Sequence, residues 1–176
     1  MPTNSRMRDF LAETQSIGRG VVVGQTGWEA LLETNRKAFL DAWVRRPEFF
    51  ALQAAKTNEE LVNVLFANGG VGASEEMALR TQLIDGLNGG TETRATALRK
   101  IVESHAFVDK TYNPSFVLMQ YYGYLRRNPN DVPDENLNGY HFWLNKLNQF
   151  GGDFRTAEMV KSFIVSGEFR GRFGKN

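Results

Sequence analysis

The sequence predicts an all-α fold. Three segments of similar pattern, at residues 38–49, 96–107 and 158–169, each carry two apolar pairs four residues apart and end in a lone phenylalanine. Those closing residues, Phe49, Phe107 and Phe169, recur at nearly equal intervals, as in helical repeat proteins. Between the segments the apolar residues follow helical spacing, and only Val21 to Val23 has the pattern of a strand.

Composition narrows the classes of function. The 176 residues are 41% hydrophobic and 12% aromatic, which is enough for one well-filled core or two small ones. A net charge of +1 provides no field that would gather nucleic acid. Cysteine is absent, so disulfides, thiolate metal sites and cysteine nucleophiles are excluded. No apolar run approaches the ~20 residues of a transmembrane helix, and residues 1–15 lack the apolar core of a signal peptide.

Helix starts are predicted where a capping side chain precedes an apolar stripe. Thr57-Asn58-Glu59-Glu60 has the sequence of a capping box, and Asn113-Pro114 joins a capping residue to a proline suited to the first helical turn. Further starts are predicted at Trp28, at Ser74, and at Thr91 or Thr93. Helix ends are predicted at Pro47 and at the glycine pairs Gly69-Gly70, Gly89-Gly90 and Gly151-Gly152.

These elements predict a helical array of about two repeated units with a preceding half-unit. Residues 1–27 form an N-terminal extension with a glycine-rich loop. A first helical unit with its half-unit covers residues 28–112, a second covers 113–176, and 28–176 are expected to form one compact domain. Because Phe107 and Phe169 each close a repeat, we expect both to be buried. The clearest helical face consists of Tyr140, Trp143, Leu144 and Leu147.

A family resemblance rests on two motifs of the second unit. Leu125-Arg126-Arg127-Asn128-Pro129 is followed by Gly139 and Trp143, and later by Ser166-Gly167-Glu168-Phe169. In this order they resemble the bacterial domain of unknown function 4214 family, whose fold is similar to the linker domains of phycobilisomes. The resemblance is clear over residues 113–173 and faint over 60–107. Arg126 stands where that family usually has glycine.

The resemblance implies a helical, non-catalytic interaction module. Members of the family commonly lie at the C-terminal ends of large exported or surface proteins, so it also implies an extracellular or cell-surface location within a longer chain. It offers no catalytic residues to carry over. The residues themselves agree, because His105 and His141 have no second histidine or cysteine at ligand spacing. We therefore expect no enzymatic activity.

The loop before the helix at Tyr140 offers one candidate metal site. Asp134, Asn136, Asn138 and Tyr140 occupy positions 1, 3, 5 and 7 of a calcium loop, with Gly139 at position 6. Position 12 falls on Asn145, which cannot supply the usual bidentate carboxylate. The alternative is a long turn in which Asx-type hydrogen bonds satisfy the backbone without metal. No other cofactor is expected.

Two aromatic residues lie off the predicted apolar stripes. Tyr122 and Phe142 are therefore candidates for exposed rings that bind a partner. The leading hypothesis is a non-catalytic protein-interaction or scaffold module that binds a protein partner or a second copy of itself. The alternative is a calcium- or glycan-binding surface domain that uses the Asp134–Gly139 loop and the neighbouring aromatic rings.

Overall fold

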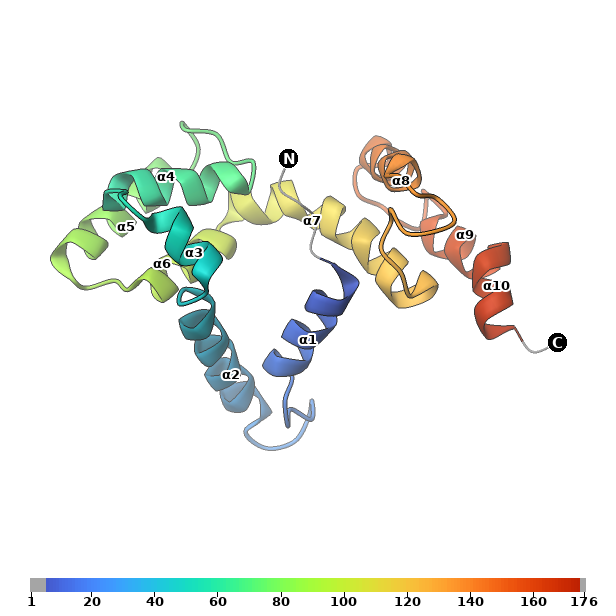
Figure 1. The fold of residues 1–176 in the computed structure, drawn as a ribbon, viewed down its shortest axis with the longest axis horizontal. Helices are drawn as coiled ribbons and strands as arrows, with labels where there is room; N and C mark the ends of the chain where they lie inside the picture. The colour runs from blue at the N-terminus through green and yellow to red at the C-terminus, as the bar shows by residue number, and fades with distance from the viewer. Residues whose placement is uncertain (1–5, 175–176) are drawn as a thin grey trace. The chain divides into compact units, whose positions relative to one another are not determined.

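The computed structural model describes residues 6–174, and within that range the fold is all-α, as predicted (Figure 1). Ten α-helices and one π-helical turn account for its regular structure. The elements are α1 (Met7–Ile17), α2 (Trp28–Trp43), α3 (Pro47–Gln53), α4 (Asn58–Asn68), α5 (Met77–Gly89), α6 (Arg94–Val102), α7 (His105–Gln120), η1 (Tyr121–Leu125), α8 (Asn138–Gln149), α9 (Met159–Val165) and α10 (Gly167–Phe173). No helix in this part of the chain has the length and apolar composition that crossing a membrane requires.

The chain divides into two compact units. Unit 1 comprises residues 8–110, and unit 2 comprises residues 6–7 and 111–174 of those described. Helix α7 contributes to both units, because the division falls between Lys110 and Thr111. The repeat array and the single compact domain expected over residues 28–176 stay predictions.

The core of unit 1 is enclosed by helices α3 to α6 (Figure 1). Helix α4 supplies four buried residues, whereas none of the residues of α1 or α2 is buried. The core therefore lies at α4, and the two N-terminal helices lie at its periphery. The buried cluster consists of Phe49, Leu61, Val62, Leu65, Phe66, Val71, Leu83, Ala97, Leu98 and Ile101.

Several helix boundaries predicted from the sequence are confirmed. Thr57 and Glu60 form the predicted capping box, in which Thr57 Oγ1 accepts from the Glu60 backbone N–H at 3.1 Å. Thr93 caps α6 in the same way. Pro47 is the first residue of α3, where its missing N–H costs no hydrogen bond. Gly90 ends α5 in a left-handed conformation that glycine adopts without strain.

Two local predictions are wrong. Ser74 does not cap α5, which follows Glu76 instead. Asn113-Pro114 does not start a helix, because α7 begins at His105 and continues through Pro114. Val21 to Val23 lie in the glycine-rich loop and form no strand, and hydrogen bonds from Val21 N–H to Gly18 O and from Gln25 N–H to Val22 O make turns on either side of Val22.

The three recurrent phenylalanines share a local arrangement. Each is the third residue of a helix that starts soon after the preceding helix ends: Phe49 in α3, Phe107 in α7 and Phe169 in α10. Only Phe49 is buried, at 6% exposed. Phe107 and Phe169 are half-buried, so the prediction that both are buried is wrong. Phe107 packs against the rim of the unit 1 core rather than within it.

Alanine substitutions at two separate glycines, Gly69 and Gly89, test how closely Phe107 is packed. A Cβ at Gly69 would lie 2.2 Å from the Phe107 ring, whereas a Cβ at Gly89 would meet nothing within 4 Å. We expect Gly69→Ala to lower the free energy of unfolding by about 1–3 kcal/mol, because the ring must move. Gly89→Ala should raise it by about 0.5–1 kcal/mol, because alanine loses less backbone entropy in a helix. Urea denaturation measures both, and equal effects would contradict this packing.

Candidate functional site

Unit 2 is organised around the side chain of Arg127, which lies two residues after the end of η1 and is 6% exposed. The residue before it, Arg126, ends η1 in a left-handed conformation with φ 52°. Non-glycine residues rarely adopt this conformation. The turn at Arg126 separates the helical run of α7 and η1 from the loop that leads to α8.

Two carboxylates neutralise the Arg127 guanidinium. Its Nε and Nη2 donate to the two carboxylate oxygens of Glu168, at 2.7 and 3.0 Å, in a bidentate pair. Nη2 also donates to Asp134 Oδ2 at 2.6 Å. Glu168 lies on α10 and Asp134 in the loop before α8, so one buried cation joins two segments far apart in the sequence.

The third nitrogen of Arg127 fixes the path of the loop backbone. Nη1 lies 3.1–3.2 Å from three carbonyl oxygens, those of Asn128, Pro129 and Asp131. Burial by itself would lower the pKa of Arg127, but its hydrogen bonds to Glu168 and Asp134 outweigh burial and raise that pKa. The guanidinium therefore stays charged. We call Arg127, Asp134, Glu168 and the three carbonyls the Arg127 network.

The loop also carries the Asx-type hydrogen bonds predicted for it. Asp131 Oδ2 accepts from the backbone N–H and the side-chain amide of Asn128, at 3.0 and 2.6 Å. These bonds lower the pKa of Asp131, because they favour its charged form. Asn136 Oδ1 accepts from the Asn138 backbone N–H at 2.8 Å, at the start of α8.

The candidate calcium ligands already have partners within the fold. Asp134 pairs with Arg127, Asn136 with the backbone of Asn138, and the hydroxyl of buried Tyr140 donates to the Pro114 carbonyl at 3.4 Å. Residues 6–174 contain no cluster of three or more histidine or acidic side chains that could hold a metal. Calcium binding by Asp134, Asn136, Asn138 and Tyr140 stays a prediction.

Tyr122 is not the exposed ring that the sequence predicts. Its side chain is 3% exposed, and burial raises its pKa. The expectation assumed α-helical spacing, whereas Tyr121 to Leu125 form a π-helical turn. Because a π-turn holds more residues than an α-turn, it changes which side chains face inward, and Tyr121 and Tyr122 are both buried.

Phe142 is exposed, as predicted, and lies on the outer face of α8. It is 59% exposed, and Phe150, which follows the end of α8, is 42% exposed. A hollow of about 330 Å³ is lined by these two rings together with Asn145, Lys146 and Gln149. We call these five residues the α8 platform. Phe150 is not among the partner-binding residues expected from the sequence, although its position about two helical turns after Phe142 indicates a shared face.

A series of ring contacts connects the α8 platform to the core of unit 2. Ring centroids lie 5.1 Å apart for Phe142 and Trp143, 5.5 Å for Trp143 and Phe163, and 5.2 Å for Phe163 and Tyr121. The Arg127 guanidinium lies 5.2 Å from the Tyr121 ring. Gly139 allows this packing, because a Cβ there would lie 2.7 Å from the Tyr121 hydroxyl. Packed aromatic rings therefore connect the α8 platform to the Arg127 network.

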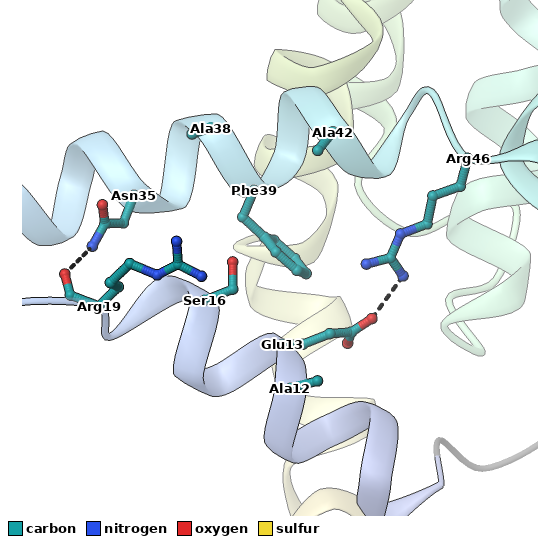
Figure 2. A pocket seen from close by; sticks show the side chains of 9 residues that line it. All are labelled: Ala12, Glu13, Ser16, Arg19, Asn35, Ala38, Phe39, Ala42 and Arg46. Atoms are coloured by element: carbon teal, nitrogen blue, oxygen red, sulfur yellow. Dashed lines mark hydrogen bonds and ion pairs between the residues drawn. The ribbon is translucent and has the colours of Figure 1, made fainter.

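Unit 1 contains a second hollow, of about 390 Å³, between α1 and α2 (Figure 2). Phe39 extends into it from α2, and Glu13 of α1 pairs with Arg46 at 2.6 Å at one end. At the other end the Asn35 amide donates to the carbonyls of Ile17 and Arg19, at 2.9 Å each.

The two histidines lie apart from both hollows. His105 is exposed at the start of α7 and is 2.9 Å from Asp109. The ring of His141 packs edge-on against the neighbouring Tyr140 ring, with centroids 5.4 Å apart.

No known protein family, no curated protein and no solved structure matches this chain.

The Arg127 network should dominate the stability of unit 2. Replacing Arg127 with lysine keeps the charge but removes the planar fork that binds Glu168 in a bidentate manner. We expect Arg127→Lys to lower the free energy of unfolding by about 2–4 kcal/mol, because buried acceptors lose charged donors. Arg126→Lys is the matched control, and its exposed side chain predicts a change within about 0.5 kcal/mol. Similar losses in both variants, measured by urea denaturation, would contradict the network.

Tyr121 provides a test of burial at alkaline pH. Burial raises its pKa to about 12 from the model-compound value of 10.0, and the nearby Asp134 charge acts in the same direction. Because the folded state favours the neutral phenol, this contribution to stability is complete below pH 10 and is lost as the pH rises through about 12. We expect Tyr121→Phe to flatten the fall in unfolding free energy over that window. Tyr112→Phe, at an exposed position, serves as the control.

Proposed function

We propose that the chain is a non-catalytic protein-interaction module that binds a partner protein on the α8 platform. The carrying observation is the pair of exposed rings, Phe142 and Phe150, on either side of a hollow of about 330 Å³. Exposed aromatic rings that line a concave surface are typical of the anchors of protein interfaces.

The attachment of the platform supports this proposal. The opposite face of α8 carries Tyr140, 5% exposed, and Leu147, fully buried, which hold the helix against the core of unit 2. Phe142 contacts Trp143 and, through it, Phe163. A preorganised surface loses little conformational entropy when a partner binds. Rigid rings at a fixed spacing favour a partner whose shape already fits the platform, because the platform itself does not rearrange.

The charge on the platform indicates the chemistry of the partner. Lys146 lies between the two phenylalanines along α8, with its Nζ 5.2 Å from the centre of the Trp143 ring. A partner segment with an apolar side chain for the hollow and a carboxylate for Lys146 would complement this surface. Binding should therefore depend on the rings for affinity and only modestly on salt.

The family resemblance supports a structural role for the motif residues. Arg127 and Glu168 form the central ion pair, Gly139 makes room for Tyr121, and Ser166 caps α10 by accepting from the Phe169 N–H at 3.1 Å. These contacts give Arg127, Gly139, Ser166 and Glu168 roles in folding, and none of the four lines the exposed α8 platform. By the same resemblance we propose that the module acts in a bacterial protein at the cell surface or outside the cell.

A glycan is the second candidate ligand for the same hollow. Asn145 and Gln149 place two side-chain amides among the exposed rings of Phe142 and Phe150. Aromatic faces and amides together suit the apolar and hydroxyl faces of a sugar. A calcium-dependent form of this binding would need Asp134 to exchange its bond with Arg127 for the metal.

The α8 platform is tested by removing its rings. Phe142→Ala with Phe150→Ala should reduce capture of partner proteins from the source bacterium at least tenfold, because the rings supply most of the contact area. Phe50→Ala is the matched control, since Phe50 is a 65% exposed ring on unit 1. Capture is quantified by label-free mass spectrometry, with circular dichroism to verify folding.

Two outcomes would change the proposal. Undiminished capture by the double variant would reject the α8 platform as a docking surface. Loss of binding on a glycan array, with protein capture unchanged, would instead assign the hollow to a sugar.

A further inference from the structure

Helix α1 is attached to unit 1 without burying any of its residues. It is amphipathic: Met7, Phe10, Leu11 and Ile17 form an apolar stripe, and each of them is only half-buried. By contrast, α4 buries Leu61, Val62, Leu65 and Phe66. Since the stabilisation from packing scales with buried apolar area, α1 is held more weakly than the core helices.

Polar contacts between α1 and the segment of α2 and Arg46 lie at the two ends of a hollow (Figure 2). Glu13 pairs with Arg46, whose guanidinium also lies over the Trp43 ring, 3.9 Å from its centre. The Asn35 amide holds the C-terminal end of α1 through two carbonyls. A hollow of about 390 Å³ remains between these ends, so the two helices do not interdigitate closely.

The connection between α1 and α2 is a glycine-rich hinge over residues 18–27. Gly20, Gly24 and Gly27 all have positive φ, at 71°, 90° and 83°. Val22 and Val23 at its tip are 54% and 77% exposed, so the tip is not packed against the rest of unit 1. Glycine offers many backbone conformations, and opening this hinge exposes no buried side chain of its own.

We propose that α1 exchanges between two copies of this chain, so that α1 of each copy docks on α2 of the other. The occupant of the α2 face is already known from the structure, because α1 binds there within one copy. An exchanged pair keeps the Glu13–Arg46 and Asn35 contacts, and the Met7 N–H bond to Asn128 Oδ1 and the Arg6–Asp131 ion pair form between copies as well. Opening breaks these polar contacts but exposes no buried residue of α1, so its cost is smaller than that of removing a core helix. This self-association is independent of the α8 platform.

The hinge sets the concentration at which exchange occurs. A flexible connection of this length holds α1 near its own α2 at an effective concentration of the order of millimolar. The closed single copy therefore dominates in dilute solution, and exchange becomes measurable as the chain concentration approaches that value. Shortening the hinge should favour exchange, because α1 can then no longer fold back.

A deletion of residues 20–27 tests the proposal in the full chain. Asn35, which holds the end of α1, lies about 10 Å along α2 from Trp28. The remaining Gly18-Arg19 spans at most about 11 Å between the two helices. Packed helix axes also lie about 8–10 Å apart, so the direct path is about 13 Å and the shortened connection cannot cover it. We expect this variant to form a dimer at micromolar concentration, at least a hundredfold below the native chain, as measured by light scattering across a dilution series.

Charge reversal distinguishes exchange from any other association of the deletion variant. In that background Glu13→Arg or Arg46→Glu alone places like charges together and should weaken the dimer about tenfold. An equal mixture of the two variants restores both opposite-charge pairs, but only if each α1 docks on the other copy. Recovery of a mixed dimer, detected by native mass spectrometry, is the expected result.

Two results would overturn the proposal. One is a deletion variant that stays folded by circular dichroism and monomeric at 1 mM. The other is a dimer whose stability ignores both charge reversals, because its contacts would then lie outside the α1–α2 face. Circular dichroism of every variant separates loss of docking from loss of folding.

Discussion

One buried charge, that of Arg127, sets the architecture of unit 2. Removing a guanidinium from water is costly, and the cost is offset only when its donors are matched by charged or polar acceptors. Glu168 and Asp134 supply the charges, and three loop carbonyls supply the remaining acceptors. Glu168 comes from α10, whereas Asp134 and the three carbonyls come from the loop before α8. The positions of α10 and of this loop therefore both depend on the Arg127 side chain. The α8 platform inherits its fixed geometry from this arrangement through Tyr121 and the ring contacts.

Unit 1 uses the same principle with weaker partners. Arg80, 5% exposed, donates to the carbonyls of Gly72 and Glu75 at 2.9 Å each and to Asn63 Oδ1 at 2.8 Å, and its guanidinium lies 4.2 Å from the centre of the Phe66 ring. Burial lowers the pKa of Arg80, against the opposing charges of the nearby glutamates. In both units, then, one arginine fixes the loop that joins two helices. A neutral set of acceptors suffices for the short loop after α4, whereas the longer loop before α8 is fixed by two ion pairs.

The parts of the structure that follow from local chemistry were predictable from the sequence. The Thr57 capping box depends on residues three apart, and the exposure of Phe142 follows from its place on a regular helix. Features that depend on distant residues were not predictable. Pro114 was expected to start a helix, but the packing of α7 on both sides outweighs one missing hydrogen bond. Tyr122 is buried because of a π-turn that no local pattern indicates, and the pairing of Arg127 with Glu168 joins motifs 41 residues apart.

Helix α7 has a mechanical consequence that its sequence determines. Pro114 has no backbone N–H, so the carbonyl four residues earlier, that of Lys110, loses its partner in the helical ladder. The chain passes from unit 1 to unit 2 at that same residue. Helix α7 therefore lacks one backbone hydrogen bond at the place where it passes from one unit to the other. We therefore expect this turn to open first when the chain is heated or pulled, so that the unfolding of one unit stops here instead of continuing along α7 into the other.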